Sequence, residues 1–392
     1  MRVAHVITRM IVGGAQENTL YNCLDLRQQY DDRVLLVTGP ALGPEGDLLQ
    51  RGRAGDLRVE VISSLRRNIH PRDALAYRDI RKALAEFEPD VVHTHSAKGG
   101  WLGRRAAAAL DVPAIIHSVH GAPFHDYQSA LARRFFISCE RYAARFCHRF
   151  ICVADAMTNL MVEAGVAPVE KFKTIYSGME TGPFLEAKSH RKRVRSKLGI
   201  APEEVVFAKV ARFFHLKGHD DLIEAASKVI AQSDSPIKFL LLGDGILRPE
   251  MESRMSDLGI RDHFIMPGLV PPAQIPEMLG ACDAVVHTSY REGLARALVQ
   301  GLLTGLPVIS YDIDGAREVV LPGQTGFLVA AGDQNRLVTS MSELASDQSL
   351  RERLGKEGQK RFAPIFDHRE MTQQIRELYL EVLSEGAEQR TA

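Results

Sequence analysis

The chain contains 392 residues, of which 45% are hydrophobic and 25% are charged. This is the ordinary mixture of a soluble globular protein, so it excludes the disordered and fibrous classes, and the length indicates two or three domains. Lysine plus arginine and aspartate plus glutamate both number 49, giving a net charge of +0. The overall charge therefore gives no reason to expect nucleic acid as a partner.

The 5 cysteines are scattered and form no CxxC pair, a pattern typical of reduced thiols in a cytoplasmic protein. The N-terminus carries only a short, interrupted apolar run, which predicts a first strand and no signal peptide. No segment approaches the roughly 18 uncharged apolar residues of a membrane-spanning helix.

Short β-branched runs alternate with segments of helical period along the first half of the chain. The predicted strands there are Val3–Thr8, Val34–Thr38, Val59–Ile62, Val91–His95, Ala114–His117, Phe150–Val153 and Lys173–Tyr176. The predicted helices between them include Asp73–Glu86, Gly103–Leu110 and Gln128–Phe146.

The same alternation restarts in the second half. The predicted strands there are Val205–Val210, Lys238–Leu242, His263–Met266, Ala284–Thr288, Pro307–Tyr311 and Gly326–Val329. Apolar strands that alternate with helices are typical of parallel sheets covered on both faces. The predicted fold class is therefore α/β, with two Rossmann-like, doubly wound parallel-sheet domains that face a central cleft. Such sheets bind ligands at the carboxyl ends of their strands.

A change of composition separates the two halves. Residues 177–197 contain Gly178, Gly182 and Pro183 and then a basic run that ends at Lys197. This pattern predicts a solvated linker. The expected organisation is a domain over 1–180, a linker over 181–196, a domain over 197–364 and a C-terminal helix over 365–392. That helix would pack back on one of the halves, with the N-terminal domain as the favoured partner.

The most informative motif follows the predicted strand that ends at Thr288. Glu292, Gly293 and Leu294 come after it, and a helix follows them. Free backbone N–H groups at a helix start can hold a diphosphate, and glycine lets the diphosphate approach. A carboxylate at the same place can accept hydrogen bonds from sugar hydroxyls. Taken alone, Glu292 is explained equally well as a negative charge at a helix N-terminus.

A second motif supplies two cations. Arg212 follows the strand 205–210, and Lys217 precedes the next helix, so both lie at the carboxyl edge of the sheet. Two such cations can neutralise a diphosphate leaving group without a metal. Taken alone, two unrelated surface cations are the simpler explanation.

Two further motifs lie in the first half. Gly13 and Gly14 follow the first strand and open a helix, so a phosphate or sugar can approach the backbone there. They do not form GxGxxG, which weakens a dinucleotide interpretation. His120, next to Gly121, follows the strand 114–117 and is placed for contact with a ligand, although a lone histidine is more often structural.

The histidines of the first half raise the question of a metal; they are His93, His95, His117, His120 and His125. His93 and His95 are two apart on a strand and so share a face. However, Asp126 is the only acid nearby and no HExxH spacing occurs. We predict no metal site and keep zinc as a minor alternative.

Taken together and in this order, the motifs resemble those of the family 4 retaining glycosyltransferases, which have the two-domain GT-B architecture. The resemblance covers nearly the whole chain. The matching motifs are Gly13-Gly14, His93-Thr-His95-Ser, Val119-His120-Gly121, Arg212 with Lys217-Gly, Gly243-Asp-Gly245, Glu292-Gly-Leu and Gly305-Leu-Pro-Val. Several spaced motifs in the right order are far more specific than any one of them.

The resemblance implies that the domain over 197–364 binds a nucleoside-diphosphate sugar. Arg212 and Lys217 would hold the diphosphate, and Glu292 would bind the sugar hydroxyls. The amides of Gly293 and Leu294 would bind the phosphate or the sugar. UDP is the default nucleotide and GDP the next choice, with the base read by backbone near residues 268–270.

The resemblance also implies a role for the domain over 1–180, which would bind a glycan or lipid-linked acceptor. Gly14 and His120 would close over the donor, and Gly13 would also bind it. His120 would be a catalytic residue together with Glu292, Arg212 and Lys217. Such transferases are generally thought to retain the anomeric configuration by front-face attack, with the leaving diphosphate taking the acceptor's proton. A hexose or N-acetylhexosamine would be transferred in surface polysaccharide assembly, and neither a cofactor nor a metal is implied.

One departure from the family pattern concerns the nucleotide. The family has two glutamates with seven residues between them, and here Gln300 stands in the second place. Eight helical residues span about 12 Å, so the two side chains would serve opposite ends of the donor. An amide replaces one carboxylate acceptor of the ribose diol, a loss of about 1–3 kcal/mol. We expect a weaker or altered donor site. Ala295, in place of the common proline, and Ser177, in place of the usual asparagine, are milder departures.

Residues 128–150 are locally basic and aromatic. Their arginines outnumber the single acid, Glu140, and aromatic side chains are interleaved with them. On a helix this pattern predicts a surface that rests on anionic lipid at the inner face of the cell membrane. A core helix whose arginines face water explains the pattern equally well.

Two other functions stay open at this point. A catalytically silent nucleotide-sugar-binding subunit is suggested by Gln300. A nucleotide-sugar epimerase is a second alternative, because a related two-domain architecture supports epimerisation. However, no converging pair of acid/base carboxylates is evident. A Rossmann oxidoreductase is least favoured, because no GxGxxG with a downstream acid follows either first strand.

Overall fold

The computed structural model describes residues 1–42, 46–49 and 55–391. The chain divides into two compact units. Unit 1 consists of Met1–Met179 and Asp367–Ala392, and unit 2 consists of Glu180–Phe366. Each unit is built on one sheet in which every strand pairing is parallel.

Unit 1 has a seven-stranded sheet in the order β3-β2-β1-β4-β5-β6-β7. Its strands are β1 (Arg2–Arg9), β2 (Arg33–Gly39), β3 (Arg58–Val61), β4 (Val91–His95), β5 (Ala114–Val119), β6 (Arg149–Cys152) and β7 (Phe172–Thr174). Its helices are α1 (Gly14–Tyr30), α3 (Asp73–Phe87), α4 (Ala97–Ala108), α5 (Ala130–Ala144), α6 (Asp155–Glu163) and α15 (His368–Thr391), with a 3-10 turn η1 (Val169–Lys171). Buried strands with apolar side chains on both faces account for the continuous apolar runs in the sequence.

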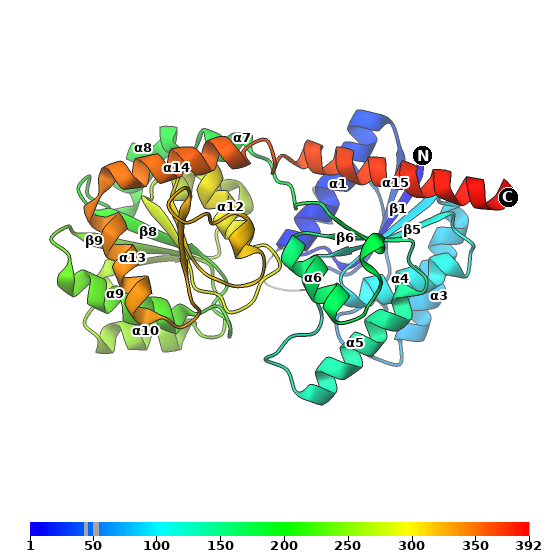
Figure 1. The fold of residues 1–392 in the computed structure, drawn as a ribbon, viewed down its shortest axis with the longest axis horizontal. Helices are drawn as coiled ribbons and strands as arrows, with labels where there is room; N and C mark the ends of the chain where they lie inside the picture. The colour runs from blue at the N-terminus through cyan, green and yellow to red at the C-terminus, as the bar shows by residue number, and fades with distance from the viewer. Residues whose placement is uncertain (43–45, 50–54, 392) are drawn as a thin grey trace. The chain divides into compact units, whose positions relative to one another are not determined.

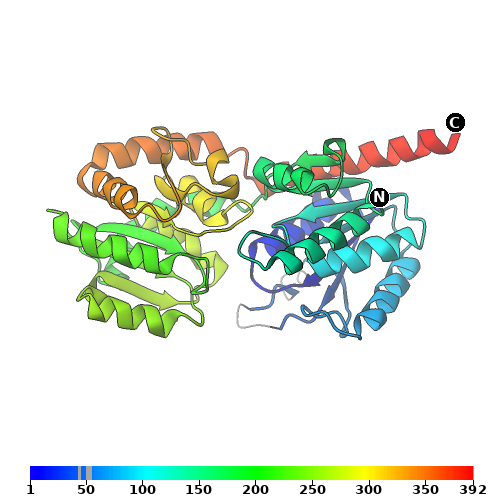
Figure 2. The ribbon, with the colours of Figure 1, turned by 60° about the horizontal axis from the view of Figure 1, so that its bottom comes forward.

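Helices cover both faces of this sheet (Figure 1), and a hydrophobic core lies between the sheet and each layer of helices. The helices α1 and α15 pack on one face, where α15 contributes Met371, Ile375 and Leu378. The helices α3 and α4 pack on the other face, and the buried positions Ala76 and Ile80 of α3 fall one turn apart. Figure 2 shows α15 running beside this unit to the end of the chain.

Unit 2 has a six-stranded sheet in the order β10-β9-β8-β11-β12-β13. Its strands are β8 (Val205–Val210), β9 (Ile237–Leu242), β10 (Phe264–Gly268), β11 (Ala284–His287), β12 (Val308–Tyr311) and β13 (Gly326–Val329). Its helices are α7 (Gly182–Leu185), α8 (Arg191–Leu198), α9 (His219–Gln232), α10 (Arg248–Asp257), α11 (Ile275–Gly280), α12 (Arg296–Leu303), α13 (Gln334–Ser346) and α14 (Gln348–Phe362). Four 3-10 turns complete it, η2 (Ala187–His190), η3 (Arg261–His263), η4 (Pro272–Gln274) and η5 (Asp314–Glu318).

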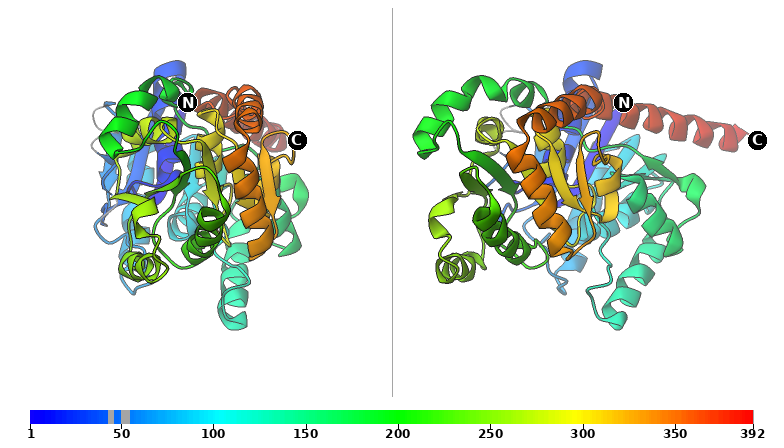
Figure 3. Two further views of the ribbon diagram at one scale, coloured as in Figure 1. Left: turned by 90° about the vertical axis from the view of Figure 1, so that its left-hand side faces the viewer. Right: turned by 60° about the vertical axis from the view of Figure 1, so that its left-hand side comes forward.

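The helices of unit 2 also cover both faces of its sheet, as the views in Figure 3 show. The helices α9, α10 and α13 share one core with the strands. On the other face α12 packs so closely that a Cβ at Gly301 would lie 2.6 Å from Val285 Cγ2. Two parallel sheets, each with helices on both faces, confirm the predicted α/β class with two doubly wound domains.

The strand order reverses once in each sheet. In unit 1 the reversal lies between β1 and β4, and in unit 2 it lies between β8 and β11. Loops that leave the carboxyl ends of two strands on either side of such a reversal run apart and leave a crevice, which is where doubly wound sheets bind ligands. The loops after these four strands are therefore the places to look for a site.

The residues predicted to form a linker, 181–196, are largely helical. Residues 182–198 form α7, η2 and α8, which belong to unit 2. Arg191 and Arg195 lie one turn apart on α8 and both bind Asp283, with N–O distances of 2.7 and 3.4 Å. The basic run looked solvated because its acidic partner lies far away in the sequence.

Two helices begin at other residues than predicted. The helix predicted from Gly103 begins at Ala97, because Gly99 and Gly100 let it lie directly on the sheet. A Cβ at Gly99 would come within 2.7 Å of the backbone nitrogen of Thr8. The C-terminal helix α15 begins at His368 and packs on α1 in unit 1.

Candidate active site

The loop after β8 carries the predicted cations. It runs from Arg212 to Gly218, and α9 begins at the next residue. Leu216 and Gly218 both have left-handed backbone, with φ of 64° and 59°. A Cβ at Gly218 would lie 1.9 Å from the carbonyl oxygen of Thr288, so only glycine fits this turn. The close approach brings the loop against the end of β11.

Lys217 and Glu292 meet at this edge of the sheet. The Lys217 ammonium donates a hydrogen bond to Oε1 of Glu292, and 23% of each side chain is exposed. Burial acts to raise the pKa of the Glu292 carboxyl, but Lys217 and His287 together hold that pKa below its usual value. Glu292 is therefore an ionised hydrogen-bond acceptor at neutral pH.

Two neighbouring contacts fix the two loops to each other. The backbone N–H of Tyr290 donates to the carbonyl of Leu216 at 2.8 Å. The Tyr290 hydroxyl donates to Asp221 Oδ2, at the start of α9, at 2.6 Å. The loops that carry Lys217 and Glu292 are thus held in a fixed relation before any ligand binds.

More residues separate Glu292 from the following helix than we predicted. Helix α12 begins at Arg296, with Ala295 as its N-cap, so Gly293 does not open it. The backbone N–H of Glu292 donates to Asp314 Oδ2 at 2.7 Å, which fixes the turn. The acceptor for this N–H comes from 22 residues further along the chain, which sequence spacing does not indicate.

The other predicted donor residues lie around this turn. Gly293 is buried, Leu294 is half-buried, and Gln300 is half-buried on α12. Arg212 is exposed, and its guanidinium lies 4.9 Å from the centroid of the Phe214 ring. The structure thus brings Lys217 and Glu292 together and places Arg212 at the exit of β8 in the same loop as Lys217.

Two buried basic residues beneath the pair were not predicted. His287, the last residue of β11, has its Nε2 3.6 Å from Glu292 Oε1, and burial lowers its pKa to about 3. Lys209, the next-to-last residue of β8, is 1% exposed, and its ammonium donates to Thr288 Oγ1 at 2.6 Å. Burial lowers the pKa of Lys209 to about 7. A lysine inside an otherwise apolar strand was the signal that we overlooked.

The predicted residues of unit 1 lie at the corresponding edge of its own sheet. Gly13 is the N-cap of α1 and Gly14 is its first residue, directly after β1. His120 lies one residue beyond β5 and is half-buried. Its Nε2 is 3.2 Å from Nδ1 of His95, the last residue of β4.

A histidine cluster occupies the core of unit 1. The ring nitrogens of His5, His93 and His95 that could bind a metal lie within 4.8 Å of one another. Both nitrogens of His93 are already engaged, by Tyr379 at 2.5 Å and Ser118 at 2.7 Å. Metal binding would break these bonds and bury a divalent charge beside neutral rings. We therefore interpret the cluster as a hydrogen-bonded core.

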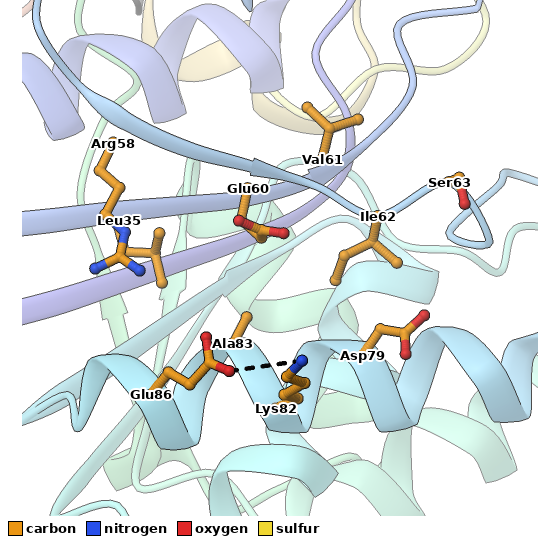
Figure 4. A pocket seen from close by; sticks show the side chains of 10 residues that line it. All are labelled: Leu35, Arg58, Glu60, Val61, Ile62, Ser63, Asp79, Lys82, Ala83 and Glu86. Carbon is orange, nitrogen blue, oxygen red and sulfur yellow. Dashed lines mark ion pairs between the residues drawn. The ribbon is translucent and has the colours of Figure 1, made fainter.

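A hollow of 240 Å³ lies at the outer edge of unit 1, between β3 and α3 (Figure 4). Charged side chains of both signs line it, including Arg58, Glu60 and Lys82, and Lys82 pairs with Glu86 at 3.7 Å. It lies on the outermost strand, and none of the predicted site residues lines it. Neutralised charges at a sheet edge offer nothing specific for a ligand, so we do not assign the site here.

Comparison with known proteins defines the class of the chain. Residues 12–182 match the family model described as Glycosyltransferase Family 4, and residues 190–361 match the model described as Glycosyl transferases group 1. The two sheets and these matches make the chain a glycosyltransferase of the GT-B fold. It belongs to glycosyltransferase family 4.

Two curated relatives and one solved structure illustrate the similarity. UDP-Gal:alpha-D-GlcNAc-diphosphoundecaprenol alpha-1,3-galactosyltransferase of Escherichia coli is 26% identical over 387 residues, which cover 98% of this chain and 97% of that one. The capsular polysaccharide biosynthesis glycosyltransferase CapM of Staphylococcus aureus is 23% identical and covers 80% of this chain and 84% of its own. Alr3699/HepE of Anabaena, solved in complex with UDP, has a TM-score of 0.80 at 23% identity, covering 97% of this chain and 100% of that chain.

Proposed function

We propose that this glycosyltransferase is a metal-independent, retaining enzyme that transfers a hexose or N-acetylhexosamine from a UDP-sugar to a glycan or lipid-linked acceptor. The product would serve bacterial surface polysaccharide assembly. The single observation that carries the proposal is the Lys217–Glu292 pair at the reversal of strand order in unit 2. The names of the Escherichia coli and Staphylococcus aureus relatives support the choice of acceptor class.

The proposed donor site assigns a task to each residue around this pair. Lys217 and Arg212 bind the diphosphate, and the Glu292 carboxylate accepts hydrogen bonds from the sugar hydroxyls. The amides of Gly293 and Leu294 bind the phosphate or the sugar. Gln300, on α12, faces the ribose diol in this assignment. Gly13 and Gly14 of unit 1 bind the donor, and His120 of unit 1 closes over the donor as a catalytic residue.

The proposed reaction needs no protein nucleophile. The acceptor oxygen forms a bond to the anomeric carbon on the face from which the diphosphate leaves, and the bonding electrons of the departing C–O bond go to the diphosphate. A diphosphate oxygen takes the proton of the acceptor hydroxyl. Lys217 and Arg212 stabilise the charge that grows on the diphosphate, and Glu292 holds the sugar in place.

The proposal is tested with a donor panel of UDP-galactose, UDP-glucose, UDP-N-acetylglucosamine and GDP-mannose against a lipid-linked N-acetylglucosamine diphosphate. We expect turnover with a UDP-sugar, unchanged by EDTA, and an α-linked product by NMR from the α-configured donor. A β-linked product would contradict retention, and loss of activity with EDTA would contradict metal independence. Binding without turnover would support the silent subunit, and isomerised free donor would support the epimerase.

We also propose that α5 rests on the anionic face of the membrane. Its outer face exposes Leu131 and Phe135, at 81% and 52%, together with Arg134. The single acid of the helix, Glu140, is buried and paired with Arg104 at 2.8 Å. An exposed apolar and basic face without an exposed acid is suited to anionic lipid. Among the described residues no helix is long and apolar enough to span a bilayer.

Vesicle flotation tests this surface. We expect the enzyme to float with vesicles of phosphatidylglycerol and phosphatidylcholine, less so at high salt, and not with phosphatidylcholine alone. The double variant L131S/F135S should lose flotation. Leu258→Ser, at an exposed leucine of unit 2, is the matched control and should float like the wild type. Equal flotation of all three proteins would contradict the assignment of α5.

A further inference from the structure

His95 lies between two other imidazole rings in unit 1. Its Nδ1 is 3.2 Å from Nε2 of His120, and its Nε2 is 3.0 Å from Nδ1 of His5. The ring centroids of His95 and His120 are 5.4 Å apart, with the planes inclined by 23°. The three rings form one hydrogen-bonded row that runs from the carboxyl end of β5 into the core.

The inner members of this row are neutral. His5 and His95 are 0% exposed. Burial lowers the pKa of His5 to about 3 and holds the pKa of His95 well below its usual value. A neutral imidazole has one N–H and one bare nitrogen, so His95 must donate to one neighbour and accept from the other. The position of the hydrogen on one ring therefore fixes its position on the next.

The buried histidines of the row are held by the sheet, whereas His120 at its other end is partly exposed to solvent. His95 ends β4 and is paired with Ile7 of β1 and Ser118 of β5. Within the described residues, Nε2 of His5 has no hydrogen-bond partner, so the row stops there. His120 lies beyond the end of its strand and is only half-buried. His95 is thus the fixed member against which His120 is oriented.

We propose that His95 is a positioning residue, which sets the ring orientation and the tautomer of His120 for the transfer reaction. The proposal rests on the function proposed above for His120. His95 is too deeply buried to contact substrate, so it acts through His120 alone. Holding a reacting group in a fixed geometry is worth large factors in rate, and a displacement of about 1 Å can cost about 100-fold.

Two substitutions separate the two hydrogen bonds of His95. The amide of asparagine lies near the place of Nδ1, whereas the longer glutamine brings its amide near the place of Nε2. His95→Asn therefore keeps the bond to His120 and loses the bond to His5, and His95→Gln does the reverse. With the UDP-sugar and acceptor that turn over in the donor panel, we expect His95→Gln to lose about 10- to 100-fold in kcat with little change in donor KM. His95→Asn should stay within about 3-fold of the wild type by the same reasoning.

His120→Ala and His93→Asn complete the set. His93 lies in the same cluster, but its ring nitrogens bond Tyr379 and Ser118, so His93→Asn should leave kcat unchanged. In the His120→Ala background, His95→Gln should cause no further loss. If His120→Ala turns over normally, the function proposed for His120 fails. If His120→Ala is impaired while His95→Asn and His95→Gln lose activity equally, the positioning role fails and the function of His120 stands.

A spectroscopic measurement tests the same proposal without substrate. Selective ¹⁵N labelling of the histidine rings in the wild-type enzyme reports each tautomer directly, with the His120→Ala spectrum used for assignment. At pH 7 we expect His120 and His95 each to show one fixed neutral tautomer. A His120 ring that averages between both tautomers would overturn the proposal.

Discussion

The ammonium of Lys217 bonds the carboxylate of Glu292, and this contact joins the loop after β8 to the loop after β11. The two residues are 75 positions apart in the sequence. The pair keeps Glu292 ionised, and it also sets the distance between a group proposed to bind phosphate and a group proposed to bind sugar. In the proposed mechanism a bound diphosphate competes with Glu292 for Lys217.

Replacement of Lys217 tests the pair. We expect Lys217→Ala to lower kcat by about 100- to 1,000-fold, because a charge that stabilises the leaving diphosphate is lost. Lys228→Ala is the matched control, since Lys228 also pairs with a glutamate of unit 2, Glu224, at 3.1 Å on the surface of α9. Steady-state kinetics of both variants provide the comparison. Normal turnover of Lys217→Ala would contradict the donor site.

Gly218→Ala tests the close contact with Thr288. The variant meets both a left-handed backbone and a collision with a carbonyl oxygen, so we expect a loss of more than about 2 kcal/mol in the free energy of unfolding. Gly199 has a similar φ of 67° but open space around its Cα, so Gly199→Ala should lose only about 1 kcal/mol. Urea denaturation of the two variants measures the difference. Equal losses would mean that the turn can move away from β11.

The pH dependence of the free energy of unfolding, compared between the wild type and Lys209→Met, tests the burial of Lys209. The pKa of Lys209 is lowered by burial from 10.5 to about 7, so between these values the unfolded chain binds a proton that the folded chain does not. Stability of the wild type should therefore rise with pH across this window, and below pH 7 the full cost of the buried charge remains. The advantage of Lys209→Met should shrink by about 2–3 kcal/mol between pH 6 and pH 9. Lys228→Met, on the surface of α9, is the matched lysine-to-methionine control.

Gln300→Glu tests the proposed ribose contact. A carboxylate offers two acceptors to a diol where the amide offers one, so we expect UDP to bind about 1–3 kcal/mol more tightly. Isothermal titration calorimetry with UDP measures the gain, and calorimetry with inorganic diphosphate is the control because it lacks the ribose. A gain with both ligands, or with neither, would contradict the placement of Gln300 at the ribose.

The fold can be predicted from the sequence because strands and helices leave local patterns of apolar residues. Buried parallel strands such as Val205–Val210 are mostly apolar runs, and each is followed by a helix of clear period. The same signals place Lys217 and Glu292 at the carboxyl edge of the sheet, and the structure brings the two side chains together. Their roles in binding donor remain predictions.

Other features depend on partners distant in the chain, which periodicity does not reveal. The pairing of Arg191 and Arg195 with Asp283 converts a basic run from a supposed linker into a packed helix. Lys209 and His287 were missed for a related reason. Each is a single basic residue in an otherwise apolar strand. Only the folded sheet shows that His287 lies 3.6 Å from Glu292 and that Lys209 bonds Thr288.

The C-terminal helix has a consequence for synthesis on the ribosome. Met371, Ile375 and Tyr379 of α15 belong to the hydrophobic core that contains β1, the first strand to be made. Unit 1 therefore cannot complete its core until α15 has left the exit tunnel, whereas unit 2 is one uninterrupted stretch that precedes α15 and can fold earlier. A nascent chain that has been made only as far as Met179 would expose the apolar face that α15 later covers.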